Sequence, residues 1–253
     1  MRLAWSLIVG GGRRRAFRVG GVSFEEAGPY GETLGLLGRQ SDHRDAERLL
    51  LAAGWTPGGA GDWAIALCSP DGAAAARISP FDPAGPYSVA LYREAAHTRQ
   101  VPELFAHRRL VGGGDFQIME WLQPVPEHEA VAFHQAIVGR EPEVAGLVEV
   151  VRRIHERARR EAPWFGIKVD DNPANVMRAA DGRLVAADLF GADGPNLYAT
   201  VANEPELIVT RIPESERRFM TEIPLTATGP WEPEVRDAMR AGLAAADARN
   251  NPA

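Results

Sequence analysis

The chain of 253 residues is long enough to bury a sizeable core, either as one large domain or as two small lobes. Its net charge of −6 excludes the broad cationic surface that binds nucleic acid, so we expect no nucleic-acid partner. The only cysteine, Cys68, excludes an intrachain disulfide, and the six histidines show no paired metal-binding spacing.

No apolar stretch approaches the ~18–20 residues of a membrane-spanning helix, so we expect no membrane partner. The N-terminal stretch MRLAWSLIVGGGRRR has a short apolar run. Arginines follow this run where a cleavable signal peptide would have small residues. We therefore expect a cytoplasmic protein, with export by a route that uses no cleaved signal as the alternative.

The first half of the chain predicts strands and short helices. Residues 1–40 are glycine-rich and irregular, and we assign them to an N-terminal extension. SDHRDAERLLLAAG predicts a helix, because Ser41 or Asp42 can cap its start and Gly54 can end it. DWAIALCSPDGAAAARISP predicts two strands joined by a Pro-Asp-Gly turn. SVALYREAAHT has helical composition, and FQIMEWLQPV predicts a short strand that ends at Pro124.

The second half predicts more helix. EPEVAGLVEVVRRIHERARREA is the clearest helix, because its apolar residues recur at i, i+3 and i+4. Its predicted apolar face consists of Val144, Leu147, Val148, Val151, Ile154 and Ala158. GRLVAADLF predicts a strand and WEPEVRDAMRAGLAAADA a final helix. Strands first and helices later predict an α+β fold with two lobes, residues 41–122 and 123–253, and a cleft between them.

Three oxygen-bearing side chains follow the long helix. Asp170 precedes Asn175 by five positions, and Asn175 precedes Asp188 by thirteen. The intervening VMRAADGRLVAA predicts a short hairpin that can bring Asn175 and Asp188 together. Two such oxygen ligands, with phosphate oxygens and water, suit Mg²⁺, and Asp170 can orient a hydroxyl and accept its proton. The pattern therefore predicts a site for phosphoryl transfer.

The pattern D-x-x-P-x-N, a hairpin and then D-L-F-G resembles the catalytic core of the protein kinase-like superfamily. This superfamily includes protein kinases and small-molecule phosphotransferases of the aminoglycoside type. The resemblance implies a two-lobed fold with a small antiparallel N-lobe sheet and a minimal, mainly helical C-lobe. It also implies ATP and Mg²⁺ as cofactors, Asp170 as the catalytic-loop aspartate, and Asn175 and Asp188 as metal ligands.

The first half matches the same superfamily in the expected order. GGAGDWAIAL resembles a glycine-rich loop in which Gly59 and Gly61 lie over the phosphates. AAAARI resembles the following strand, V-A-I-K, with Arg77 at the lysine position. YREAAH resembles the next helix, which would place Glu94 to pair with Arg77.

The stretch IMEWL resembles a kinase hinge. The resemblance implies that the carbonyl of Glu120 and the amide of Leu122 hydrogen-bond adenine, with Met119 as the gatekeeper. It extends over about 150 positions, from about residue 45 to 195. The order of the motifs along the chain supports it more than any single motif does.

Two cations depart from the superfamily pattern. Lys168 is the only lysine of the chain and stands two residues before Asp170, where kinases have histidine or tyrosine. We expect Lys168 to contact the transferred phosphate or the acceptor oxygen. Arg77 replaces a lysine, and the planar guanidinium of arginine is not interchangeable with a compact ammonium group.

We expect transfer of the γ-phosphate of ATP to a hydroxyl, first of all to Ser or Thr of a protein. DLFG and the MEWL hinge resemble protein kinases, and a compact C-lobe resembles small, divergent bacterial kinases, including secreted effectors. A small-molecule hydroxyl, of an antibiotic or a metabolite, is the alternative. Its recognition would use the acidic residues Asp193, Glu204, Glu206, Glu214 and Glu216. A pseudokinase that binds a partner without transfer and a nucleotidyl transferase on this fold are further alternatives.

The same residues also have plainer structural interpretations. DDNP is common in solvated turns, and Lys168 fits an ordinary surface position. Gly58 to Gly61 fit a flexible loop, and Arg77 with Glu94 fits an exposed ion pair.

Overall fold

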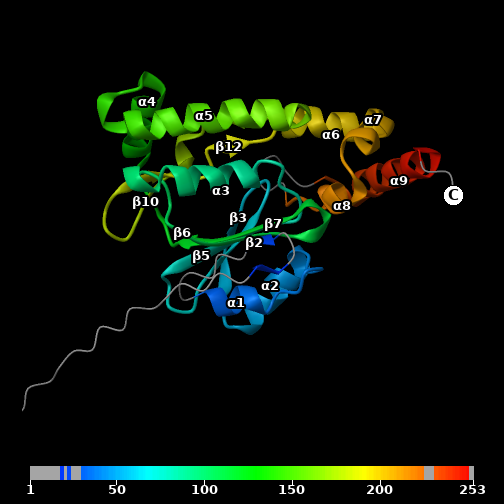
Figure 1. The fold of residues 1–253 in the computed structure, drawn as a ribbon, viewed down its shortest axis with the longest axis horizontal. Coiled ribbons are helices and arrows are strands. Elements are labelled where there is room, and N and C mark those ends of the chain that lie inside the picture. Colours follow the sequence, from blue (N-terminus) through cyan, green and yellow to red (C-terminus); the bar gives the residue numbers. More distant parts are fainter. Residues whose placement is uncertain (1–17, 20–21, 24–29, 225–230, 251–253) are drawn as a thin grey trace, which may run out of the picture.

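The computed structural model describes residues 18–19, 22–23, 30–224 and 231–250. An antiparallel five-stranded sheet comes first in this part of the chain and mostly helices follow, which confirms the predicted α+β class (Figure 1). Most of the predicted N-terminal extension lies outside the described residues. Inside it, β1 (Arg18–Val19) pairs with β2 (Val22–Ser23).

The five-stranded sheet has the spatial order β3-β4-β5-β7-β6, with every neighbouring pair antiparallel. Its strands are β3 (Thr56–Ala60), β4 (Ile65–Cys68), β5 (Ala74–Ser79), β6 (Leu104–Arg109) and β7 (Asp115–Glu120). The predicted hairpin is β4–β5. In its turn, the Ser69 hydroxyl donates to Asp71 at 2.6 Å, and Gly72 adopts a φ of +70° that favours glycine.

One face of the sheet is covered by α1 (Gly31–Gly35) and α2 (His43–Ala52). The side chain of Asp42 accepts from the amides of Arg44 and Asp45, which confirms Asp42 as the predicted cap of α2. Apolar side chains fill this face, among them Leu34, Leu50, Trp55, Ala76, Ile78, Phe116 and Ile118. Residues 30–40 therefore pack onto the sheet rather than extend away from it.

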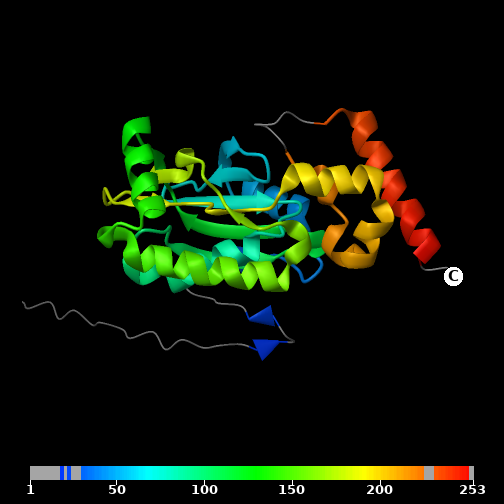
Figure 2. The same ribbon diagram turned by 90° about the horizontal axis from the view of Figure 1, so that it is seen from above.

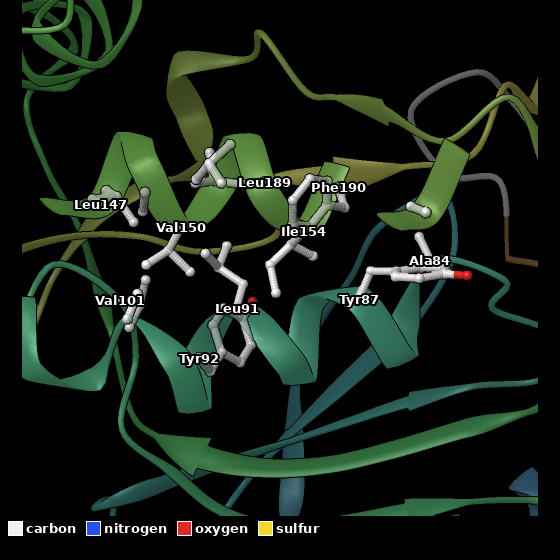
Figure 3. Close-up of a cluster of buried hydrophobic side chains, with 14 of the residues drawn as sticks. Ala84, Tyr87, Leu91, Tyr92, Val101, Leu147, Val150, Ile154, Leu189 and Phe190 are labelled. Atoms are coloured by element: carbon white, nitrogen blue, oxygen red, sulfur yellow. The ribbon is translucent and has the colours of Figure 1, made fainter. Parts of the chain in front are cut away.

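The opposite face is covered by α3 (Gly85–Glu94), which lies between the sheet and α5 (Ala145–Glu161), as Figures 1 and 3 show. Tyr87 and Leu91 of α3 share a buried cluster with Leu147 and Ile154 of α5. The predicted apolar face of the long helix is confirmed for Val144, Leu147, Val151, Ile154 and Ala158, while Val148 is half-buried and Val150 joins the core. Residues 41–122 and 123–253 thus share one core through α3.

A smaller sheet stands beside the first, with the order β11-β10-β8. Its strands are β8 (Gln123–Pro124), β10 (Val176–Arg178) and β11 (Leu184–Ala186). A further pair joins β9 (Lys168–Val169) to β12 (Phe190–Gly191). The helix α4 (Glu127–Gly139) packs against β10. These short strands hold the loop that contains Asp170 and Asn175.

The C-terminal helices gather at the end of the molecule away from α4 (Figure 2). They are α6 (Gly194–Asn203), α7 (Pro205–Arg211), α8 (Glu214–Arg217) and α9 (Pro233–Asn250). The predicted final helix, α9, is confirmed. Short 3₁₀ turns join the elements, at Ala96–Thr98, Val111–Gly113, Pro142–Val144, Pro163–Phe165, Pro173–Asn175 and Met220–Glu222. Within the described ranges, no helix has the length and apolar character that crossing a membrane requires.

Candidate functional site

A cleft of about 730 Å³ lies where the five-stranded sheet faces the β9–β12 segment. Nine of the ten residues that the sequence predicts for the site line this cleft. They are Gly59, Gly61, Arg77, Glu120, Leu122, Lys168, Asp170, Asn175 and Asp188. The tenth, Glu94, lies elsewhere. Residues from four distant parts of the sequence therefore meet in one cleft.

The cleft lining contains an apolar part and a charged part. In the apolar part, Ala75 and Met119 lie opposite each other on β5 and β7, and Leu122 and Met177 also line the cleft. In the charged part, ion pairs link Arg77 to Asp82 and Asp188, and Asn175 links Asp188 to Asp170. A ligand that has both an apolar ring and negative charge fits this lining.

The loop after β9 fixes Asp170 and Asn175 relative to each other. The Asp170 amide donates to the Leu189 carbonyl at 2.8 Å, and Asp170 Oδ1 accepts from the Asn172 amide at 3.0 Å. Asn175 Nδ2 donates to Asp170 Oδ2 at 3.0 Å and to the Asp188 carbonyl at 3.2 Å. Both N–H donors of the Asn175 side chain are thus engaged, and its Oδ1 is left as the atom that can bind a cation.

The predicted hairpin is confirmed as β10–β11, with Val176 opposite Ala186. The Ala187 amide donates to the Asn175 carbonyl at 2.8 Å, so the hairpin returns the chain directly to Asn175. The inference that Asn175 and Asp188 lie close together is therefore correct. Their roles as metal ligands are taken up under Proposed function.

Asp188 has an unusual backbone. Its φ of +51° lies in the left-handed region, which costs a non-glycine residue about 1–3 kcal/mol. The Asp188 amide donates to the Tyr92 hydroxyl at 2.9 Å, so α3 holds this conformation in place. Residues held in such strained conformations cluster at functional sites.

The Asp188 carboxyl faces other charges. Its partial withdrawal from bulk water raises its pKa, Arg77 opposes this rise, and the carboxylates of Asp82 and Asp170 add to it. Its side chain is nevertheless 46% exposed. Negative charge therefore concentrates in this part of the cleft, where a cation would be stabilised.

Arg77 on β5 is held by two carboxylates. Its Nη1 lies 2.6 Å from Asp82 Oδ2, and its Nη2 lies 3.4 Å from Asp188 Oδ1. Burial lowers the pKa of the Arg77 guanidinium, but the carboxylates of Asp188 and Asp82 raise it by more than burial lowers it. The net pKa is therefore raised, and the guanidinium stays charged. A fixed positive charge thus stands in the cleft at the place where the sequence predicts one.

The predicted pairing of Glu94 with Arg77 is wrong. Glu94 lies in the last turn of α3 and pairs instead with Arg153 at 2.6 Å and Arg157 at 3.5 Å, both on α5. It is nine residues beyond Gly85, which is about 13 Å along the helix axis. The start of α3 is close to Arg77, and Glu94 is at the other end.

The predicted hinge joins β7 to β8. The Glu120 amide donates to the Glu103 carbonyl at 3.0 Å, and the Trp121 amide donates to the Ala73 carbonyl at 2.9 Å. The Glu120 carboxylate pairs with Arg183 and accepts from the Glu103 amide. These bonds fix the segment as one wall of the cleft, with Met119 and Leu122 buried beside it.

The glycines of the predicted phosphate loop lie in β3 and its turn. Gly59 has a φ of +146° at an irregularity in the β3–β4 pairing, and a Cβ there would meet nothing within 4 Å. The Gly61 amide donates to the Ala64 carbonyl at 2.8 Å and closes the turn. A Cβ at Gly58 would come within 3.0 Å of Trp121. Gly58 therefore lets β3 lie against Trp121, and the positive φ of Gly59 favours glycine at that position.

Lys168 is exposed and begins β9, where it pairs with Gly191. Both residues line the cleft. Lys168 thus belongs to the same cleft as Asp170.

The donor atoms suit Mg²⁺ better than a transition metal. The described residues contain no group of three or more His, Cys, Asp or Glu side chains that could hold a metal ion. Mg²⁺ needs less from the protein, because it keeps several waters and is bound through one or two side chains plus phosphate oxygens. The Asp188 carboxylate and Asn175 Oδ1 supply two oxygen donors of the required kind.

The acidic residues expected to recognise a small-molecule acceptor are not in the cleft. Glu206 pairs with Arg249, Glu214 with Arg218 and Glu216 with Arg109. Asp193 accepts from the Asn196 amide at the start of α6, and Glu204 is exposed. None of the five carboxylates therefore lines this cleft, and their role in recognising an acceptor stays a prediction.

Three cleft or support residues escape the sequence analysis, namely Trp63, Asp82 and Tyr92. Asp82 had a usable signal, since it stands before Pro83 and Gly85 at a helix start, where aspartate commonly caps. Trp63 packs against the position of Gly194, whose Cβ would lie 3.2 Å from its ring. This contact joins the β3–β4 turn to α6, and no local sequence pattern predicts it.

No protein-family model and no curated protein matches this sequence. The function therefore has to be inferred from the geometry of the cleft.

Proposed function

We propose that this protein is an ATP- and Mg²⁺-dependent phosphotransferase with a protein kinase-like arrangement of its cleft. One observation supports this most strongly. Asp170, Asn175, Asp188 and Arg77 are joined by side-chain contacts in a cleft that also has apolar lining residues. Phosphoryl transfer needs positioning and charge neutralisation rather than covalent catalysis, and these groups supply both.

In this proposal the adenine lies in the apolar part of the cleft, against Ala75, Met119 and Met177. The hinge atoms assigned to it are the Glu120 carbonyl and the Leu122 amide. The phosphates lie beneath the turn that contains Gly59 and Gly61. The cleft volume of about 730 Å³ is within the range of small-molecule sites, and it suits a nucleotide.

The charged part of the cleft performs the transfer. Arg77 grips the non-transferred phosphates, and Asn175 Oδ1 with the Asp188 carboxylate would hold Mg²⁺. When bound, Mg²⁺ neutralises charge on the phosphate oxygens. Asp170 uses one lone pair on each oxygen for the loop, which leaves others free to orient the acceptor hydroxyl and accept its proton. Lys168 stabilises negative charge near the transferred group.

The acceptor we propose is Ser or Thr of a protein. The carboxylates that would recognise a cationic small molecule lie outside the cleft, which weakens that alternative. An uncharged small-molecule hydroxyl stays as the second acceptor class. A pseudokinase or a nucleotidyl transferase would bind ATP in the same cleft. The pseudokinase would transfer no group, and the nucleotidyl transferase would transfer the nucleotide instead of the γ-phosphate.

The deciding experiment measures transfer from γ-labelled ATP with Mg²⁺ by the native chain and by Asp170→Ala. The acceptor is a cell extract separated into protein and small-molecule fractions. We expect label in the protein fraction, with a loss of about 10²–10⁴-fold in Asp170→Ala because the positioned base is removed. Asp171→Ala is the matched control, since Asp171 is an exposed neighbour outside the cleft lining.

Other results separate the alternatives. Asp170-dependent label in the small-molecule fraction would replace the protein acceptor. ATP-dependent thermal stabilisation without transfer would support a pseudokinase. Transfer of label from α-labelled ATP, with none from γ-labelled ATP, would establish a nucleotidyl transferase. A chain that neither binds ATP nor transfers label would refute the proposal.

A further inference from the structure

We infer that Asp82 is the residue that positions Arg77 for nucleotide binding, in place of the helix glutamate that the superfamily pattern implies. The inference deepens the proposed function and rests on it.

Asp82 is a buried carboxylate that is only 3% exposed. Its Oδ2 lies 2.6 Å from Arg77 Nη1. Its Oδ1 accepts from the amides of Ala84 at 2.9 Å and Gly85 at 2.8 Å. One carboxylate therefore joins the guanidinium on β5 to the first turn of α3.

The backbone of Asp82 is fixed as firmly as its side chain. Its amide donates to the Gly113 carbonyl at 2.9 Å, and its carbonyl accepts from Arg109 Nη1 at 2.7 Å. Every polar group of Asp82 is thus engaged. Because both the backbone and the side chain of Asp82 are hydrogen-bonded, its carboxylate has little freedom to move. The Arg77 guanidinium that pairs with it is therefore kept in one orientation.

The two carboxylates that pair with Arg77 differ in how accessible they are to another cation. The Asp188 side chain is 46% exposed and faces the cleft, whereas the Asp82 side chain is 4% exposed. A cation at Asp188 would compete with Arg77 for the Asp188 carboxylate. Asp82 is not available to such a cation in the same way, because both of its oxygens are already bonded. Asp82 therefore keeps Arg77 aimed into the cleft when Asp188 serves another partner.

Glu94 does not share this role, because its carboxylate binds Arg153 and Arg157 on α5. Its pairs join α3 to α5, and neither Glu94 nor its two partners line the cleft. Asp82 stands just before the start of α3 and Glu94 is its last residue, and of these two acidic residues only Asp82 contacts Arg77.

The test compares Asp82→Asn with Glu94→Gln, measuring the dissociation constant for ATP by calorimetry without Mg²⁺. Asparagine keeps the oxygen that caps α3 and removes the charge that pairs with Arg77. We expect Asp82→Asn to weaken ATP binding about tenfold, or about 1.4 kcal/mol, and Glu94→Gln to leave it unchanged. In transfer assays, KM for ATP should rise more than kcat falls.

A double-mutant cycle separates positioning from general damage. Arg77→Met should weaken ATP binding, and adding Asp82→Asn to it should cause no further loss, because Asp82 acts through Arg77. Equal losses from Asp82→Asn in both backgrounds would overturn the inference. So would ATP binding that is weakened by Glu94→Gln and unaffected by Asp82→Asn.

A charge-conserving pair covers the case in which Asp82→Asn does not fold. Arg77→Lys shortens the cation and Asp82→Glu lengthens the carboxylate, so the double variant restores their contact. We expect it to bind ATP more tightly than Arg77→Lys alone, and the reverse result would contradict the role of Asp82. Native protein that binds ATP without transferring phosphate would refute the proposed function yet leave this binding comparison decisive. Native protein that binds no ATP would overturn both.

Discussion

The two faces of the five-stranded sheet are built by alternating residues of the same strands, yet they have different chemistry. On the face toward α2, Ala76, Ile78, Phe116 and Ile118 form an apolar cluster. On the face toward α3, the intervening positions hold polar side chains, including Arg77, Ser79, His107, Asp115 and Gln117. Because successive side chains of a strand point to opposite faces, a single residue step separates the two environments.

The two faces of the sheet therefore contribute differently to the protein. The apolar face buries surface against α2, and such burial supplies stability without specifying any chemistry. Several buried groups of the polar face bond to one another, whereas Gln117 Oε1 has no hydrogen-bond partner among the described residues. Asp115 Oδ2 lies 3.0 Å from His107 and 3.6 Å from Arg109, and its Oδ1 accepts from Gln117 at 2.7 Å. The polar face therefore lends rigidity to the strands from which Arg77 reaches the cleft.

The largest effect should follow from truncating the apolar face. Phe116 is fully buried there, so Phe116→Ala should lower the free energy of unfolding by about 3–5 kcal/mol through lost burial and a cavity. Chemical denaturation measures this loss. The ATP affinity of the molecules that remain folded should be unchanged. A selective loss of ATP affinity at full stability would contradict the division between the faces.

A smaller loss, with a different dependence on pH, should follow from changing the polar face. Burial raises the pKa of Asp115, but hydrogen bonds from His107 and Gln117 and the charges of His107 and Arg109 outweigh it, so the pKa is lowered below its usual 3.8. The stabilising contribution of this carboxylate is therefore complete above pH 3.8 and is lost as the pH falls through the folded-state pKa.

Asp115→Asn should lower stability by about 3 kcal/mol at neutral pH, because it removes a charged hydrogen-bond partner of buried groups. It should also reduce the acid dependence of the free energy of unfolding. Denaturant titrations across the acid range would show this, with Phe116→Ala as the control that keeps the acid dependence. Parallel acid profiles for Asp115→Asn and the native chain would refute the assignment.

Gly85→Ala should test how closely α3 approaches the polar face. A Cβ at Gly85 would lie 2.6 Å from the Asp115 carboxyl carbon, which is inside any normal contact. We expect a loss of about 1–3 kcal/mol from this overpacking. Thermal unfolding of Gly85→Ala should be compared with that of Gly35→Ala, since a Cβ at Gly35 meets nothing within 4 Å. Equal stability of the two variants would mean that α3 has room to shift.

The smallest effect on stability should come from Lys168, on the other side of the cleft. Lys168 is exposed, so Lys168→Ala should change the free energy of unfolding by no more than about 0.5 kcal/mol. The rate of phosphate transfer should nevertheless fall, and more in Lys168→Ala than in Lys168→Arg, which keeps the charge. Unchanged rates in both variants would leave Lys168 as an ordinary surface residue.

Local patterns predicted the elements whose signals lie within one segment. The long helix has a regular apolar stripe, the β4–β5 turn has Pro-Asp-Gly, and the hairpin between Asn175 and Asp188 has a turn of its own. For this reason the grouping of Asn175 with Asp188 followed from spacing. The strand β6 escaped prediction, because LFAHRR presents His and Arg where an apolar alternation would be expected.

Long-range pairings could not be predicted in the same way. Glu94 was assigned to Arg77 from its place in a motif, but the choice between Arg77 and α5 depends on how far α3 extends past the sheet. The pairing of Asp82 with Arg77 is local by contrast, because the two residues are five positions apart, and the aspartate before Pro83 and Gly85 at a helix start was its usable signal. Of the acidic residues near the C-terminus, Glu214 and Glu206 pair with arginines of their own region, Arg218 and Arg249, and neither lines the cleft.

Lys168 has a practical consequence, because it is the only ε-amino group of the chain and it lines the cleft. All other basic side chains apart from histidine are arginines, which amine-directed reagents do not acylate. Lys168 is therefore the only side chain that a lysine-directed fluorophore or crosslinker would acylate, and its protection by a bound molecule would be visible as the loss of label from the one peptide that contains it. The single lysine of the chain therefore provides a chemical probe for the binding of a ligand in the cleft.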